Sequence, residues 1–186
     1  MNQQTQIIQP LTGKQQQHVI DKTHSYIHEA EQLLDTRLKP VEVVFNLKGR
    51  AAGMYRISAQ KKRFFSSAKR EIRYNTFIFS KYFEDNVATT IPHEVAHYIT
   101  DMIYGLKNIK PHGAEWKSIM SAFDADASVT ANYDLSGITL KKQTRYTYNC
   151  DCREHQISAV RHNRILNNQH RYYCKVCKQG LQYKQG

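Results

Sequence analysis

The first half of the chain changes from a helical to an alternating pattern of apolar and polar residues. Apolar side chains recur every three or four positions after Thr12, which predicts a helix that runs to about Arg37. Thr12 and Gln15 have the spacing of a capping box, which supports a helix start at this point. Alternation then predicts three short strands, at residues 41–47, 54–58 and 71–75.

Helical periodicity returns near Thr90. Thr89 or Thr90 can cap a helix, and Pro92 fits its first turn, where a missing N–H costs nothing. The apolar stripe of this helix comprises Val95, Ala96, Ile99, Met102 and Ile103. A shorter helix is predicted over residues 114–123, with an inner side formed by Trp116, Ile119, Met120 and Phe123. A first helix, a small antiparallel or mixed sheet and these two helices predict an α+β fold.

The second predicted helix carries the motif H-E-x-x-H. His93 and His97 are four residues apart, so both imidazoles project from one face and suit one metal ion. Glu94 lies beside them and could act as a general base without being a ligand. A catalytic zinc usually has three protein ligands and an open position, and His112 is the best candidate for the third ligand.

Two acidic residues leave alternatives open at this site. Glu115 could replace His112 as the third ligand, because some zinc peptidases use a carboxylate there. Asp101, one turn beyond His97, could orient a ligand, although a surface carboxylate is the commoner outcome.

All four cysteines lie in the last 37 residues, in two close pairs. In a reducing compartment, such pairs indicate a metal site rather than disulfides. We expect Cys150, Cys152, Cys174 and Cys177 to bind a structural zinc ion, with His155 as an alternative to one thiolate. A unit of this size has too small a core to fold alone, so the metal would supply much of its folding free energy.

The formal net charge of +11 is concentrated in two segments. Residues 48–73 hold nine basic residues against one acidic residue, and residues 141–186 hold ten against two. Basic charge interleaved with Tyr and Phe is typical of proteins that bind DNA or RNA, although solvated loops explain such charge as well. The candidate contacts are Arg63, Arg70, Arg161 and Arg164. Residues 60–67 are expected to form a basic loop with Phe64 and Phe65 available for base stacking, and residues 161–164 a basic hairpin.

No apolar run approaches the roughly twenty residues of a membrane span, and the polar start has no signal-peptide h-region. We therefore expect a cytoplasmic protein without a membrane partner. A monomer is expected as well. A division into residues 1–140 and 141–186 follows from the change to a basic, cysteine-containing sequence.

Taken together, the motifs resemble the SprT-like family of zinc metalloproteases, which includes Spartan. The matching motifs are His93-Glu94-x-x-His97, His112-Gly113-x-x-Trp116, Tyr148-x-Cys150-x-Cys152, Arg161-His162-Asn163-Arg164 and Tyr173-Cys174-x-x-Cys177. The resemblance implies a minimal zincin-like metalloprotease domain over residues 1–140, followed by a zinc ribbon over residues 141–186. It also implies one catalytic and one structural Zn²⁺. For Spartan, the family activity is DNA-dependent cleavage of proteins crosslinked to DNA.

These observations favour a zinc-dependent metalloprotease that acts on proteins associated with nucleic acid. Its substrate would be held by strand addition along an edge, for which residues 51–57 are the candidate. The alternative is a non-proteolytic, zinc-stabilised protein that binds single-stranded or damaged DNA, or RNA. A peptidase indifferent to nucleic acid is a third hypothesis.

Overall fold

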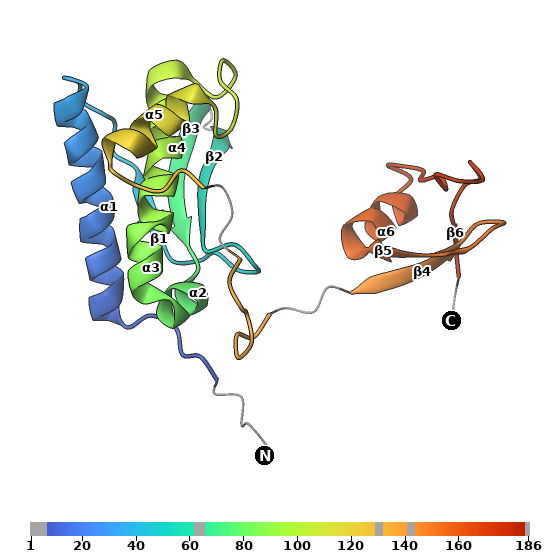
Figure 1. The fold of residues 1–186 in the computed structure, drawn as a ribbon. Coiled ribbons are helices and arrows are strands. Elements are labelled where there is room, and N and C mark those ends of the chain that lie inside the picture. The colour runs from blue at the N-terminus through green and yellow to red at the C-terminus, as the bar shows by residue number, and fades with distance from the viewer. Residues whose placement is uncertain (1–6, 62–65, 129–131, 141–143, 185–186) are drawn as a thin grey trace. The chain divides into compact units, whose positions relative to one another are not determined.

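The computed structural model describes residues 7–61, 66–128, 132–140 and 144–184 (Figure 1). The chain divides into two compact units, an N-terminal unit of residues 1–140 and a C-terminal unit of residues 141–186. The N-terminal unit combines helices with a three-stranded sheet, so the predicted α+β fold is confirmed. Among the described residues, no helix has both the length and the apolar character needed to cross a membrane.

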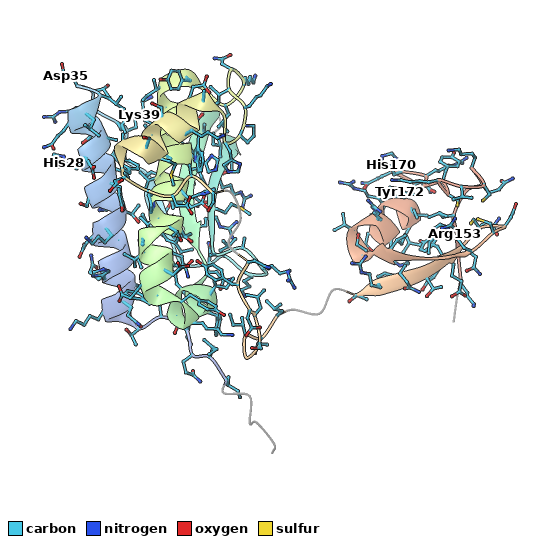
Figure 2. All side chains as sticks on the ribbon, viewed as in Figure 1. His28, Asp35, Lys39, Arg153, His170 and Tyr172 are labelled. Carbon is cyan, nitrogen blue, oxygen red and sulfur yellow. The ribbon has the colours of Figure 1, made fainter. Side chains whose placement is uncertain are left out.

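Helix α1 (Gly13–Leu33) begins at the predicted capping box. The Thr12 side chain accepts a hydrogen bond from the Gln15 N–H, and the Gln15 side chain accepts one from the Thr12 N–H. The helix ends at Leu33 rather than near Arg37, and Asp35 lies just beyond its end (Figure 2). Asp35 has a positive φ of 44°, which does not continue the helix. The Thr36 N–H then bonds back to the Glu31 carbonyl, which closes the helix end.

The sheet of the N-terminal unit has the order β1-β3-β2. Its strands are β1 (Glu42–Val44), β2 (Gly53–Lys61) and β3 (Ser66–Tyr74). Strand β1 runs parallel to β3, and β2 runs antiparallel to it, so β2 forms one edge. Backbone pairing between β2 and β3 continues as far as Lys61 and Ser66. The ends of the loop expected at residues 60–67 therefore belong to these two strands. Arg63, Phe64 and Phe65 lie outside the described residues.

Two short helices connect the sheet to the motif-bearing helix. Helix α2 (Thr76–Lys81) contains the apolar run after β3, and the Asn75 side chain caps it by accepting hydrogen bonds from Phe77 and Ile78. Helix α3 (Phe83–Ala88) runs almost directly into α4 (Thr90–Tyr104). Thr89 occupies the N-cap position of α4, as expected, but its side chain does not cap the helix, because the Thr89 hydroxyl donates to the Asp85 carbonyl of α3 instead.

Helix α4 forms the centre of the N-terminal unit. It packs against α1, α3, α5 (Ala114–Ala122) and β2 (Figure 1). Val95, Ala96 and Ile99 are fully buried, whereas Ile103 of the predicted stripe is exposed. The inner side of α5 is as predicted, with Trp116, Ile119, Met120 and Phe123 all buried. Contacts on several sides of α4 make it a rigid support for its two histidines.

The C-terminal unit has a second small sheet, of order β5-β4-β6. Its elements are β4 (Arg145–Asn149), β5 (Glu154–Ser158), α6 (Ala159–Leu166) and β6 (Gln182–Tyr183). Tyr146 stacks on His162 with ring centroids 3.6 Å apart, and the Tyr148 hydroxyl lies 3.1 Å from His162 Nδ1. Residues 161–164 lie in α6, so the expected hairpin is wrong. The segment contains no Gly or Pro that would favour a tight turn over a helix.

Candidate metal centres

Three histidine side chains converge at the surface of α4. His93 and His97 come from adjacent turns of this helix, and His112 comes from the loop between α4 and α5. The distances between their Nε2 atoms are 3.2 Å for His93 and His97, 3.0 Å for His97 and His112, and 3.1 Å for His112 and His93. Tetrahedral zinc, with Zn–N bonds of about 2.0–2.1 Å, separates two nitrogen ligands by about 3.3 Å. The three imidazoles therefore fit a zinc ion.

Burial keeps these imidazoles neutral at pH 7. Desolvation, with a smaller effect of His112, lowers the pKa of His93 to about 4. Desolvation and the two neighbouring rings lower the pKa of His97 to about 3, and desolvation lowers that of His112. A neutral imidazole has a free lone pair, so all three side chains are in the form that binds metal.

His112 reaches the other two rings because a tight turn places it there. The Gly113 N–H bonds to the Lys110 carbonyl at 2.9 Å, with Pro111 and His112 between them. His112 has a φ of 55°, in the left-handed region that non-glycine residues adopt at a cost. Among the residues that the structure describes, the potential metal ligands that cluster here are the three histidines, without Glu115. The local backbone thus presents His112, rather than Glu115, to the helix.

The positive φ of His112 predicts different stabilities for two substitutions that both remove the imidazole. In metal-free protein, we expect His112→Gly to be more stable than His112→Ala by about 1 kcal/mol, because glycine adopts this φ freely. Urea unfolding followed by the fluorescence of Trp116, the only Trp, measures the difference in the N-terminal unit. Equal stability of the two variants would contradict the strained geometry.

Trp116 supports the three histidines from α5. Its ring lies 4.8 Å from the ring of His93, 5.7 Å from that of His97 and 4.7 Å from that of His112, as centroid distances. Its Nε1–H donates to the His93 carbonyl at 3.3 Å, and the side chain is fully buried. The sequence predicted a core position for Trp116, but contact with all three rings depends on how α5 crosses α4.

Glu94 lies next to the histidines in a buried position between α4 and β2. Its Oε2 accepts a hydrogen bond of 2.6 Å from the Tyr55 N–H. Burial raises the pKa of the Glu94 carboxyl to about 7, although the bond from Tyr55 acts in the opposite direction. The close approach requires Gly53, where an added Cβ would lie 2.6 Å from Glu94 Cγ and 2.7 Å from Thr90 Cγ2. A carboxyl group held in this way can accept and return a proton near neutral pH.

Gly53→Ala is therefore expected to displace the Glu94 side chain. Misplacing a general base by an ångström can cost roughly 100-fold in rate, so with Glu94 in the general-base role expected from the sequence we predict a loss of that order in peptide cleavage, with zinc content unchanged. Gly13→Ala is the matched control, because nothing lies within 4 Å of a Cβ at this position. Peptide cleavage and metal analysis of both variants measure the effect, and full activity of Gly53→Ala would show that this contact does not position Glu94.

Asp101 joins α4 to both long strands of the sheet. Its Oδ2 accepts hydrogen bonds from Arg70 Nε at 2.6 Å and from the Tyr55 hydroxyl at 2.7 Å. Asp101 is buried, so its expected surface position is wrong. Arg70, proposed from the sequence as a nucleic-acid contact, is held by this carboxylate. Tyr55 thus links β2 to Glu94 through its backbone and to Asp101 through its side chain.

The basic segment at residues 48–73 is partly neutralised by its own Glu71 and by two acidic residues from outside it, Glu42 and Asp101. Lys69 Nζ lies 2.8 Å from a Glu42 carboxylate oxygen and 2.6 Å from one of Glu71, while Arg70 pairs with Asp101. The count of charges along the sequence therefore overstates the positive charge that this part of the surface presents.

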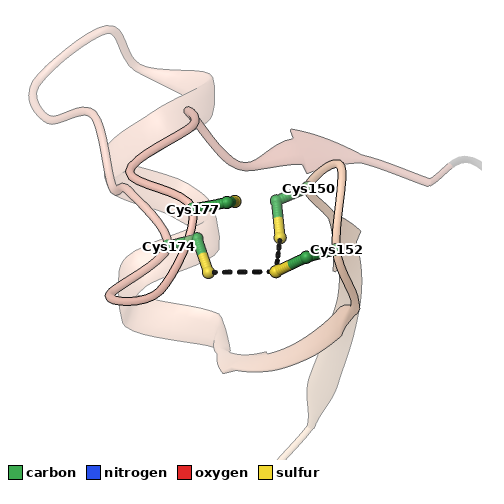
Figure 3. Close-up of side chains that lie close together, drawn as sticks. All are labelled: Cys150, Cys152, Cys174 and Cys177. Carbon is green, nitrogen blue, oxygen red and sulfur yellow. Dashed lines mark hydrogen bonds between the residues drawn. The ribbon is translucent and has the colours of Figure 1, made fainter.

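The four cysteines form a second candidate metal site (Figure 3). Cys150 and Cys152 lie in the β4–β5 turn, and Cys174 and Cys177 lie in the turn before β6. The sulfur atoms are 3.5 Å apart in Cys150 and Cys152 and 3.7 Å apart in Cys152 and Cys174, too far for disulfides. Tetrahedral zinc with Zn–S bonds of about 2.3 Å separates its thiolates by about 3.8 Å. The site and its two turns match the zinc ribbon expected from the sequence.

Neighbouring groups support the thiolates of this cluster. The Val176 N–H donates to Cys174 Sγ at 3.4 Å. His155 Nε2 lies 3.1 Å from Cys150 Sγ, which places His155 beside the four sulfur atoms as a hydrogen-bond partner. Among the described residues, the side chains close enough together to bind one metal ion here are the four cysteines, without His155.

Comparison with known proteins identifies the family of this chain. The sequence model of the SprT-like family matches residues 23–136. Protein SprT of Vibrio atlanticus is 30% identical over 170 residues, which cover 91% of this chain and 93% of that protein. Protein SprT of Pasteurella multocida is 32% identical over 137 residues, which cover 73% and 74% of the two chains. The chain belongs to the SprT-like family. A search of solved structures gave no significant match.

Proposed function

We propose that this chain is a zinc-dependent peptidase whose active site is the histidine triad and Glu94. The observation that carries the proposal is the convergence of three Nε2 atoms within 3.2 Å, with a buried carboxyl group lining the same pocket. His93, His97 and His112 would hold the ion. When bound, zinc supplies a Lewis acid and lowers the pKa of a coordinated water to about 7.

The proposed chemistry assigns the proton transfers to Glu94. Its carboxylate accepts a proton from the attacking water and delivers it to the leaving amine as the peptide bond breaks. The Tyr55 N–H keeps Oε2 in place, and burial between α4 and β2 limits the rotamers that the side chain can adopt. Glu94 thus needs no reorganisation between the two transfers.

The edge strand β2 is proposed to hold the substrate. In an antiparallel pair, backbone groups alternate between facing the partner strand and facing away from it. Because the Tyr55 N–H points to Glu94, the backbone groups of Gly53 and Ile57 are expected to point to the same outer edge. A peptide laid along this edge as an added strand would pass the histidine triad.

A cleavage assay tests the proposed function directly. Zinc-loaded protein is incubated with an unstructured protein substrate, with and without single-stranded DNA, and with and without a chelator. The proposal predicts cleavage that the chelator abolishes. Absence of cleavage under every condition, including self-cleavage, would leave the alternative of a non-proteolytic zinc protein that binds DNA or RNA.

The C-terminal unit supports the further proposal that the substrates are proteins associated with nucleic acid. Arg153 and Tyr172 lie in this unit (Figure 2), and with Arg161 they line one pocket. The Arg161 guanidinium lies 5.5 Å from the centre of the Tyr172 ring. Arg164 is exposed on α6. Cations beside accessible aromatic rings suit the phosphates and bases of single strands.

Binding to single-stranded DNA should weaken as salt rises, because basic side chains release counterions from the phosphates. We expect a double substitution of Arg161 and Arg164 by Gln to weaken binding and to flatten its salt dependence. The same experiment with RNA establishes the preferred nucleic acid. Binding that is undetectable at low salt, or indifferent to salt, would contradict this part of the proposal.

A further inference from the structure

Two pockets of different chemical character meet at the proposed catalytic residues. One has a volume of about 630 Å³, the other a volume of about 470 Å³, and His93 and Glu94 line both. Gly53 lines the larger pocket, whereas Met54 and Tyr55 line the smaller one. A peptide that follows β2 past the triad would therefore leave one pocket and enter the other at the reacting centre.

The larger pocket is polar. Its lining includes the charged side chains of Arg50, Asp85 and Asp126, together with Ser128 and Asn132. Asp85 accepts a hydrogen bond from the Tyr133 hydroxyl, and Asp126 accepts hydrogen bonds from the backbone and hydroxyl of Ser128. The pocket carries charges of both signs, and two of its carboxylates already accept hydrogen bonds from this chain. The larger pocket therefore favours no single kind of substrate side chain.

The smaller pocket is apolar. Beyond the catalytic groups, its lining includes Met54, Leu106, Ile109, Pro111 and Trp116. Trp116 is buried, but Met54 is 40% exposed and Leu106 is 47% exposed, so both offer apolar surface to a group that enters the pocket. Exposed apolar residues that surround a concave site with a few polar groups mark a binding site for an apolar group.

We propose, on the basis of the proposed peptidase function, that this pocket binds an apolar side chain of the substrate immediately beside the bond that is cut. Successive side chains of an added strand point to opposite faces, so one residue next to the scissile bond would enter the pocket while its neighbour points away. The pocket between Met54 and Leu106 thus makes unfolded chains with exposed Leu, Met or Phe the preferred substrates. Folded proteins bury such residues and would be spared.

Leu106 offers a substitution that changes the pocket with little effect on the fold. Its backbone N–H is held by Asp101 Oδ1 at 3.3 Å, independently of the side chain. Leu106→Lys places a cation at the rim of the pocket. Lys is chosen over an acidic residue because a carboxylate at this position could bind the zinc ion. Tyr104→Lys is the matched control, because Tyr104 is 45% exposed in the same segment but does not line the pocket.

The test is a cleavage profile over a randomised peptide library, read by mass spectrometry with single-stranded DNA present. We expect wild type and Tyr104→Lys to prefer Leu, Met or Phe over Ser or Asp at one position beside the cut by at least about tenfold. Leu106→Lys should lose this preference and favour Asp or Glu at the same position. As a second measurement, Glu94→Gln protein should bind a peptide with Leu at this position more tightly than its Ser counterpart, and Leu106→Lys should remove the difference.

The outcomes separate the pocket from the peptidase function. Cleavage by wild type without an apolar preference, or a preference that Leu106→Lys leaves unchanged, would overturn the proposed pocket and leave the peptidase intact. Absence of cleavage by wild type with every peptide would contradict the peptidase function, and with it the pocket as a substrate site.

Discussion

Glu94→Gln is expected to lower the rate of peptide cleavage by about 10²–10⁴-fold, the usual contribution of a general base. The amide has nearly the same shape as the carboxylate, and its oxygen can accept the hydrogen bond from the Tyr55 N–H. What it lacks is the capacity to take a proton from water. We therefore expect the fold and the zinc content to stay as in wild type while cleavage is lost.

Glu115→Gln is the matched control for this experiment. Glu115 lies three residues beyond His112, and it is a carboxylate outside the described ligand cluster. We expect this variant to cleave as fast as wild type and to bind as much zinc. If Glu94→Gln protein instead cleaves an unstructured substrate at the wild-type rate, the assignment of Glu94 is wrong.

The second large effect is expected in the C-terminal unit. Cys152→Ser or Cys174→Ser should remove one zinc ion per chain and unfold residues 144–184, while the N-terminal unit stays folded. The buried side chains of the described part of this unit are Tyr148, Ile157, His162 and Cys174, which form only a small core. A structural zinc ion contributes about 10–16 kcal/mol of apparent binding free energy, far more than such a core supplies.

Amide hydrogen exchange and metal analysis measure this effect, and His155→Ala is the control. His155 touches Cys150 Sγ without joining the sulfur cluster, so His155→Ala should keep its zinc and its protection from exchange. Loss of zinc in His155→Ala, together with retention in one of the cysteine variants, would show that the histidine replaces a thiolate.

The sequence predicted those features of the site that depend on local geometry. Helical spacing alone places His93 and His97 on one face of a helix. Pro111 and Gly113 predict the turn at which His112 points back to them, and the structure shows this turn closed by a hydrogen bond from Gly113 to Lys110. The start of the first helix and the inner side of α5 follow equally from local patterns. The candidate edge at residues 51–57 overlaps β2, which does lie at an edge, but that position depends on the pairing of β2 with β3 and not on a local pattern.

Contacts between distant segments could not be predicted in this way. Asp101 is buried because Arg70 and Tyr55, from two strands far away in the sequence, meet its carboxylate. The role of Gly53 depends on how closely β2 approaches Glu94, and no pattern within one segment carries that information. The charge counted along the chain overestimated the positive charge of the surface for the same reason, because the partners of Lys69 and Arg70 come partly from other segments.

Anomalous X-ray diffraction at the zinc edge tests most directly whether the three imidazoles hold one zinc ion beside Glu94. For crystals of zinc-loaded protein, we predict a peak about 2.0–2.1 Å from the Nε2 atoms of His93, His97 and His112. A second peak among the four cysteines serves as an internal control for zinc loading. A map with the cysteine peak but none among the three histidines would contradict the account.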